Sequence, residues 1–236
     1  MFKKAVPLLI LLLSWNALFA QPFELNAANI TWTSQSKDAS QSMPCGGGDI
    51  GLNVWVENGD LFFYLSQSGA FDENNAFLKA GRVKLQLYPN PFKGQSFKQE
   101  LILKDGYVKI NGANGKLRAE IQVWVDVFHP IIHLELNATE PVKAIASFES
   151  WRDKNRVLTR KENNANSWKW ASGVTVITKK DSIGFNNNQV IFYHQNSDST
   201  VFDATVKQEG LNQIKSSLFN PIKGRVSGGI MLGNGM

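Results

Sequence analysis

Two short segments of the sequence combine carboxylates with aromatic side chains, a combination that suits sugar recognition. The first is Phe71-Asp72-Glu73-Asn74-Asn75, and the second is Glu149-Ser150-Trp151-Arg152-Asp153. Aromatic rings pack against the C–H faces of sugars, and charged groups hydrogen-bond to their hydroxyls. Hydrolysis of a glycosidic bond needs two carboxylates about 5–10 Å apart, and sequence spacing does not fix that distance across strands. We therefore assign no catalytic residue, and we predict that the rim of a carbohydrate site includes Asp72, Glu73, Glu149, Trp151, Arg152 and Asp153.

Each segment also has a structural interpretation that involves no ligand. The first can be a solvated loop, and the second can contain an internal ion pair between Arg152 and a neighbouring carboxylate. The exposure of Trp151 separates the two interpretations of the second segment. An exposed ring beside charged groups suits sugar stacking, whereas a fully buried ring favours packing.

Two histidines invite a zinc interpretation. His129 and His133 are four residues apart, the spacing of two ligands on one face of a helix. Pro130 and the isoleucines after it favour an extended chain instead. Four extended residues separate the histidines by roughly 13 Å, which is too far for one ion to bridge. The sequence predicts no metal site and no cofactor.

A glycine-rich motif and a single cysteine are the remaining candidates. Gly46 to Gly51 satisfies G-x-G-x-x-G, but a strand follows it, where a dinucleotide site needs a helix. We predict a glycine-rich turn that enters a strand. Cys45 has no partner base nearby, so we interpret it as a small core residue, and one cysteine excludes an intramolecular disulfide.

The elements that position these groups are short alternating strands. Ile50 to Glu57 alternates, Asn58-Gly59 has the composition of a tight hairpin turn, and Leu61 to Gln67 is the predicted return strand. Strands at this regular spacing predict an all-β fold, specifically a two-sheet antiparallel β-sandwich of supersandwich type with few short helices. Further strands are predicted at Arg82 to Tyr88, Phe97 to Lys104, Tyr107 to Asn111, Lys116 to Asp126 and Ile131 to Asn137.

The second part of the chain is less regular. We predict an exposed loop at Asn155 to Ser167, a turn at Asp181 to Asn188, and one or two helical turns at Asp72 to Ala80. No internal repeat or linker is evident, so residues 21–236 are predicted to form a single β-sandwich domain. Later strands are predicted at Trp168 to Trp170, Gly173 to Thr178, Gln189 to His194 and Val201 to Gln208.

The N-terminus has the pattern of a secretory signal peptide. Lys3-Lys4 precede an apolar run from Ala5 to Leu13, and Ala17 and Ala20 precede a predicted cut before Gln21. The predicted leader is residues 1–20, and the mature chain is expected in the periplasm or outside the cell. The apolar run is too short to span a bilayer, so we expect no membrane insertion after removal of the leader.

Composition and charge narrow the function further. Of 236 residues, 43% are hydrophobic and 19% charged, which excludes general disorder. The formal net charge of +5 falls to +3 without Lys3 and Lys4. The remaining basic residues form no stripe interleaved with aromatics, so we expect no nucleic-acid partner.

Several glycine and tryptophan motifs resemble those of a known enzyme class. Met43-Pro44, Gly46 to Gly51, Val54-Trp55 and the Asn58-Gly59 hairpin resemble the opening of secreted glycoside hydrolases of the α-fucosidase (family 95) type. The stretch from Gln99 through Asp105-Gly106 to Trp124 and His129 is similar to later strands of the same domain. The likeness covers most of residues 23–236. Closer still is an uncharacterised N-terminal domain common in exported bacterial polysaccharide-degrading proteins, which is similar at Glu149 to Arg152, Asn220-Pro221 and Gly228-Gly229.

This resemblance implies a non-catalytic N-terminal β-sandwich that packs against an (α/α)₆ catalytic barrel lying further along the chain. The barrel carries the catalytic carboxylates in such enzymes, so a chain without it should release no sugar. A surface that the barrel normally covers should be apolar and exposed. Two other interpretations stay open: a free-standing carbohydrate-binding module, and a cell-surface structural domain without a ligand.

Overall fold

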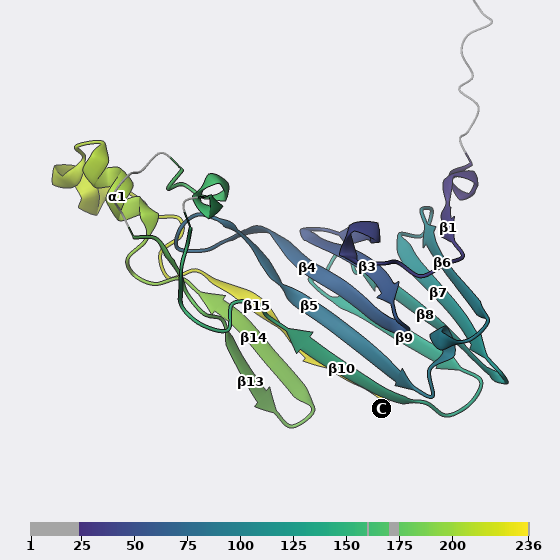
Figure 1. Ribbon diagram of the computed structural model, residues 1–236. Coiled ribbons are helices and arrows are strands. Elements are labelled where there is room, and N and C mark those ends of the chain that lie inside the picture. Colours follow the sequence, from purple (N-terminus) through teal and green to yellow (C-terminus); the bar gives the residue numbers. More distant parts are fainter. Residues whose placement is uncertain (1–23, 160, 170–174, 236) are drawn as a thin grey trace, which may run out of the picture.

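The computed structural model describes residues 24–159, 161–169 and 175–235 (Figure 1). The predicted leader lies outside the described residues, as do Trp170, Gly173 and Val174 of two predicted strands. Among the described residues, no helix has the length and apolar character needed to cross a bilayer.

Two five-stranded antiparallel sheets form the body of the molecule and confirm the predicted β-sandwich. The first sheet has the order β1 (Ile30–Trp32), β6 (Ser96–Ile102), β7 (Tyr107–Asn114), β8 (Leu117–Val125) and β9 (Ile132–Ala138). The second has the order β10 (Lys143–Glu149), β5 (Phe77–Tyr88), β4 (Asp60–Phe71), β3 (Ile50–Glu57) and β2 (Met43–Gly47).

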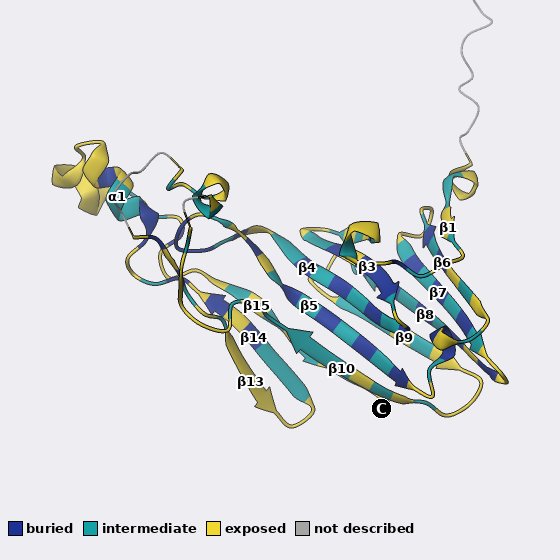
Figure 2. Ribbon diagram, in the orientation of Figure 1, coloured by how far each residue is buried: buried dark blue, intermediate teal, exposed yellow. Residues whose placement is uncertain are grey.

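The alternation along these strands builds the core. In β8, Ile121, Val123 and Val125 are buried, while the residues between them are partly exposed. β8 ends at Val125, and Val127, which continues the alternation of apolar residues in the sequence, is exposed. Buried residues from both sheets pack in one cluster, so a period of two places one face of each sheet inside (Figure 2).

The predicted hairpin signals are confirmed where glycine and asparagine take positive φ angles. Asn58 and Gly59 have φ values of 52° and 83° and join β3 to β4, with Glu57 paired to Asp60. The glycine-rich motif enters β3 through a turn at Gly48-Asp49 as predicted, but Gly46 and Gly47 are not part of that turn: they end β2, which pairs with β3.

Trp55 is buried although it lies on the outer face of the second sheet. It alternates with the core residues Val54 and Val56, and its ring stacks on Phe62 with centroids 5.2 Å apart. Tyr64 packs beside it at 4.9 Å. Trp55 is therefore part of an aromatic cluster on that face and is covered from solvent.

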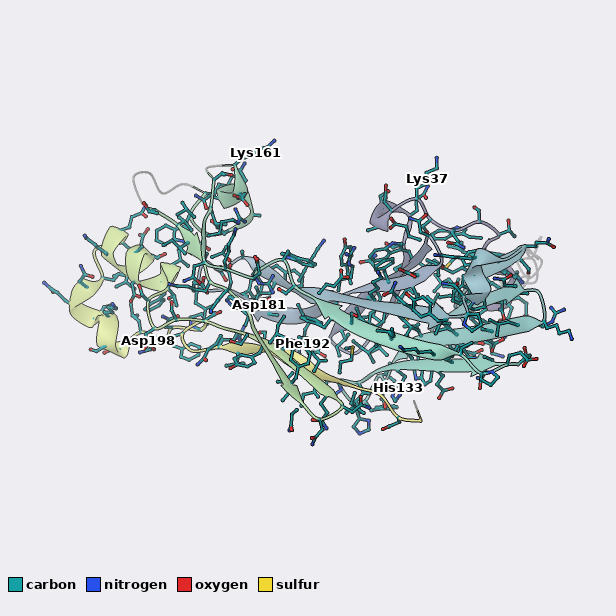
Figure 3. The ribbon with its side chains drawn as sticks, turned by 60° about the horizontal axis from the view of Figure 1, so that its bottom comes forward. Lys37, His133, Lys161, Asp181, Phe192 and Asp198 are labelled. Carbon is teal, nitrogen blue, oxygen red and sulfur yellow. The ribbon has the colours of Figure 1, made fainter. Side chains whose placement is uncertain are left out.

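A third, C-terminal sheet packs at the end of the sandwich. It consists of β13 (Ser182–Asn186), β14 (Gln189–Gln195) and β15 (Val226–Leu232) in that order. Phe192 of β14 stacks on Phe148 of β10, with ring centroids 3.8 Å apart and planes 13° from parallel. Figure 3 shows Asp181 and Phe192 in the middle of the molecule, where the C-terminal sheet meets the second sheet.

The remaining elements are short. They are the strands β11 (Arg156–Val157) and β12 (Ile177–Thr178), the helix α1 (Val201–Gln208), and five 3₁₀ turns, η1 (Leu25–Ala28), η2 (Ala39–Gln41), η3 (Pro91–Lys93), η4 (Glu162–Ala165) and η5 (Asn212–Ser217). Helix α1 and η5 lie at the end of the molecule far from β1 (Figure 1).

Four local predictions are wrong. The strand predicted at Trp168 to Trp170 is a turn at its two described residues, Trp168 and Lys169. Val201 to Gln208 is the helix α1, because Thr200 and Asp203 form a capping box that stabilises its first turn. Most of the turn predicted at Asp181 to Asn188 is the strand β13, and only its end turns, at Asn187 with φ 53°. The helical turns predicted at Asp72 to Ala80 are a tight turn followed by β5, because backbone N–H groups bond to Asp72 instead of continuing a helix.

Candidate functional site

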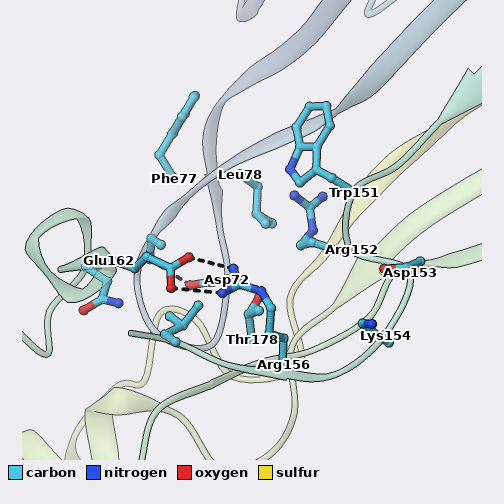
Figure 4. Close-up of a pocket in the computed structure, with 13 residues that line it drawn as sticks. Asp72, Phe77, Leu78, Trp151, Arg152, Asp153, Lys154, Arg156, Glu162 and Thr178 are labelled. Carbon is cyan, nitrogen blue, oxygen red and sulfur yellow. Dashed lines mark hydrogen bonds and ion pairs between the residues drawn. The ribbon is translucent and has the colours of Figure 1, made fainter. Parts of the chain in front are cut away.

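A cavity of about 200 Å³ lies where the second sheet meets the loops that follow β10 (Figure 4). It collects residues from both predicted carboxylate–aromatic segments, although about 80 positions separate them in the sequence. The lining includes Asp72, Phe77, Trp151, Arg152, Asp153, Lys154, Arg156 and Glu162.

Two aromatic rings at this cavity face solvent. Trp151 and Phe77 are each 50% exposed. The Trp151 ring contacts Tyr64 edge-on, with centroids 5.9 Å apart, so the outer-face aromatic cluster of the second sheet continues to the cavity. The exposure of Trp151 agrees with the ligand interpretation of its segment, because packing alone predicted a buried ring.

Asp72, Glu73 and Asn74 are only 3–4% exposed, so the interpretation of this segment as a solvated loop is wrong. Asp72 accepts hydrogen bonds from the N–H groups of Asn74 (2.9 Å) and Ala76 (2.8 Å), which close the turn. Asn74 donates to the carbonyl of Ile177 and accepts from the indole N–H of Trp168. Burial raises the pKa of Asp72, although the two backbone hydrogen bonds oppose this.

Behind the cavity wall, His194 is held between two carboxylates. Its Nε2 lies 3.0 Å from Glu73 Oε2, and its Nδ1 lies 3.0 Å from Asp181 Oδ1. A neutral imidazole has one N–H and can donate to only one of two carboxylates, whereas the protonated ring donates to both. Burial opposes the charge on His194, but the hydrogen bonds with Asp181 and Glu73 outweigh it and raise its pKa to about 9.

Asp181 joins this histidine to the cavity wall. Its Oδ1 also accepts from Arg152 Nε at 2.8 Å, and its Oδ2 accepts from Ser150 Oγ at 2.5 Å. The Asp181 N–H donates to the Arg152 carbonyl at 2.8 Å. Arg152 therefore does pair with a carboxylate, as the structural interpretation of its segment expected, and that carboxylate is the more distant Asp181.

Burial opposes ionisation of both carboxylates, yet each has a lowered pKa. For Glu73 burial is outweighed by the hydrogen bond from His194 together with backbone hydrogen bonds, including that from the Lys179 N–H, and the charge of His194. For Asp181 it is outweighed by the hydrogen bonds from His194, Arg152 and Ser150 together with the charge of Arg152. Two negative and two positive side chains thus balance in one buried group. We call Glu73, Arg152, Asp181 and His194 the buried charge cluster.

The outer wall of the cavity carries a second ion pair. Arg156 binds Glu162 through two parallel N–H···O bonds of 2.9 and 2.8 Å (Figure 4). The hydrogen bonds from Arg156 and from the Thr159 N–H lower the pKa of Glu162 to about 2. The Arg156–Glu162 pair and Arg152 therefore place hydrogen-bond donors and acceptors around the cavity.

The six predicted site residues fall into three places. Asp72, Trp151, Arg152 and Asp153 line the cavity. Glu73 lies behind it, bound to His194. Glu149 points elsewhere and pairs with Arg82 on the neighbouring strand β5.

The other candidates lie apart from the cavity. Nδ1 of His129 lies 3.1 Å from Oδ2 of Asp126, and the His133 ring stacks on Trp124. Cys45 is half-buried, and burial raises the pKa of its thiol. The described residues hold no group of three or more histidine, cysteine or acidic side chains placed to bind a metal ion.

Sequence reasoning did not single out His194 and Asp181. Each stands alone in its segment, Asp181 before β13 and His194 within β14. A histidine at an inward position of a strand, next to the core residue Phe192, was the available signal. A buried histidine needs polar partners, and only the tertiary structure identifies them.

Fold and cavity together define a β-sandwich protein with a surface cavity lined by aromatic and charged side chains. The chain belongs to the DUF5703 family, a domain of unknown function, whose N-terminal model (DUF5703_N) matches residues 31–236. No curated protein matches the sequence.

Proposed function

We propose that this chain is the non-catalytic β-sandwich domain of an exported glycoside hydrolase that acts on complex polysaccharide, and that its cavity contacts the sugar. The observation that carries the proposal is the exposed Trp151 beside Arg152 and Asp153 in a cavity that also receives Asp72. An exposed ring offers a stacking face, and the charged groups around it offer hydrogen bonds to hydroxyls.

The size of the cavity supports a small ligand unit. About 200 Å³ is less than the roughly 300–1,000 Å³ of pockets for drug-sized ligands. It suits one sugar ring at a time, as at the end or side branch of a polysaccharide.

An exposed apolar face supports the second half of the proposal, the catalytic partner domain. Val226, Ile230 and Leu232 alternate along β15 and are 54–59% exposed. Tyr193 and Ile191 of β14 lie opposite Gly228 and Ile230, hence on the same face. A sheet face without charges is typical of a surface covered by another part of the protein.

Binding to immobilised polysaccharides tests the sugar contact. We expect the chain to be retarded in affinity gels that contain fucosylated xyloglucan, and Trp151→Ala to weaken binding about tenfold, the effect of a contact worth about 1.4 kcal/mol. Phe128→Ala is the matched control, because Phe128 is an exposed aromatic away from the cavity. If Trp151→Ala and Phe128→Ala bind the polysaccharide equally well, the cavity is not the sugar-binding site.

Two further observations test the enzyme context. The chain by itself should release no sugar from aryl glycosides or oligosaccharides, and turnover abolished by Glu149→Ala or Asp153→Ala would contradict the non-catalytic assignment. A reading frame that continues past Met236 into helical hairpins would support the partner domain.

A free-standing carbohydrate-binding module is the second candidate. The feature that favours it is the cavity lining, which this chain supplies from its own residues. Sugar binding at full strength together with a stop codon after Met236 would favour this candidate over the domain of an enzyme.

A further inference from the structure

The buried charge cluster joins four segments that are distant in the sequence. Glu73 comes from the β4–β5 turn, Arg152 follows β10, Asp181 precedes β13, and His194 lies within β14. The His194 side chain is only 1% exposed, and those of Glu73 and Asp181 are each 4% exposed. These contacts tie the C-terminal sheet to the end of the second sheet.

The same cluster supports the cavity wall from behind. Arg152 and Asp72 line the cavity. Arg152 belongs to the cluster and binds Asp181, and Asp72 precedes the cluster residue Glu73 in the chain. Trp151 lies between Ser150 and Arg152, both of which bond to Asp181. The position of the exposed ring therefore depends on where Asp181 is held.

We propose that His194, in its protonated form, is the positioning residue that holds Asp181 and thereby Trp151 and Arg152 in the geometry that receives the sugar. The inference rests on the proposed function for the identity of the ligand, but the coupling between His194 and the wall is independent of it. His194 does not line the cavity and acts through Asp181.

Charge balance explains why the proton matters. With His194 protonated, its charge and that of Arg152 offset Glu73 and Asp181. Loss of the proton leaves one buried negative charge in excess and turns one nitrogen–carboxylate contact into a repulsion between lone pairs. The charged groups that face His194 are Glu73 from the β4–β5 turn and Asp181 before β13, with Arg152 behind Asp181 and Asp72 beside Glu73. When His194 loses its proton, Asp181 and the Ser150–Arg152 segment bound to it should move together.

A titration without ligand tests this coupling. The chain has seven tryptophans, so the signal of Trp151 is obtained as the difference between the wild type and Trp151→Phe. We expect acrylamide quenching of Trp151 to change between pH 7 and pH 10, with the same midpoint as the NMR titration of the His194 ring. Different midpoints, or no change in quenching, would overturn the proposal. This comparison uses the wild-type fold and needs no variant at position 194.

A pair of histidine variants makes the test specific. His194→Gln keeps a donor and an acceptor but carries no charge, so the pH-dependent change in Trp151 quenching should disappear. His129→Gln is the matched control, since His129 also contacts an aspartate but lies in the exposed turn after β8, and the change should persist. Persistence of the change in His194→Gln would assign it to another group and refute the role of His194.

Ligand binding then separates this inference from the proposed function. The affinity of the wild type for fucosylated xyloglucan oligosaccharides should fall at least about fivefold from pH 7 to pH 10, the lower end of usual coupling between sites. In His194→Gln the affinity should not vary with pH. No binding at pH 7 would contradict the proposed function alone, whereas binding that is equal at pH 7 and pH 10 in the wild type would contradict the positioning role alone.

Discussion

Gly81 of β5 leaves no room for a side chain, because the Phe148 ring of the neighbouring strand occupies that space. A Cβ atom at Gly81 would lie 2.3 Å from Phe148 Cζ and 3.0 Å from the carbonyl oxygen of Glu149. Ordinary contacts of this kind begin at 3.4 Å, so the ring would have to move by about 1 Å. The same ring stacks on Phe192 and holds the C-terminal sheet in place.

We therefore expect Gly81→Ala to lower the free energy of unfolding by about 1–3 kcal/mol, the usual cost of overpacking. For a chain of this length, each kcal/mol corresponds to a fall in Tm of about 2–4 °C. Equilibrium unfolding in urea measures the change. The m-value should stay the same if only the folded state is affected.

A double-mutant cycle identifies Phe148 as the cause. In a Phe148→Ala background the clash with the ring is gone, so Gly81→Ala should cost less than in the wild type. The cost that remains comes from the φ of +157° at Gly81 and from the Glu149 carbonyl oxygen at 3.0 Å. Gly184→Ala is the matched control in a strand, because a Cβ there meets no atom within 4 Å. It should leave stability unchanged or raise it by up to about 1 kcal/mol. An equal cost of Gly81→Ala in both backgrounds would refute the steric argument.

Two further predictions concern the C-terminal sheet. Phe192→Ala should cost about 3 kcal/mol of unfolding free energy by loss of a buried ring, whereas Phe185→Ala on the adjacent strand, with a ring 80% exposed, should change it by less than about 0.5 kcal/mol. The pH dependence of the unfolding free energy should contain a contribution from His194. Folding raises its pKa from 6.5 to about 9, so between these pH values the folded state binds a proton that the unfolded state does not. Stability therefore falls as the pH rises through this window. The full effect is about 3 kcal/mol, present below pH 6.5 and lost above pH 9, and urea unfolding of His194→Gln should lack this slope.

Alternation along the strands was enough to predict the body of the fold. β3 has the predicted bounds, and β5 to β9 lie within a few residues of the predicted strands, apart from the five residues by which β5 starts earlier. The signal is strong because one face of each strand is buried, so every second residue must be apolar. β10 was not predicted, since its core-facing residues are Ala144, Ala146 and Phe148, and the two alanines give a weak pattern.

The elements of the second part depended on contacts that local patterns do not reveal. The strand β13 alternates Ile183 and Phe185 with small or polar residues over only five positions, all of them exposed, and its pairing with β14 defines it as a strand. Helix α1 has only eight residues, and its β-branched residues Val201, Thr205 and Val206 favour a strand, whereas the capping box at Thr200 and Asp203 favours the helix. Short elements of this kind are decided by tertiary packing.

The sequence by itself determined the two-sheet sandwich, its hairpin turns and the two segments rich in carboxylates and aromatics. These follow from interactions between residues close in the chain, where period and turn chemistry are visible. Only the tertiary structure decided that Asp72 and Trp151 share a cavity, that Glu149 turns away to Arg82, and that His194 lies between Glu73 and Asp181. A buried charge is stable only with partners of opposite sign, and those partners come from segments up to 121 residues apart, a proximity that folding of the whole chain creates.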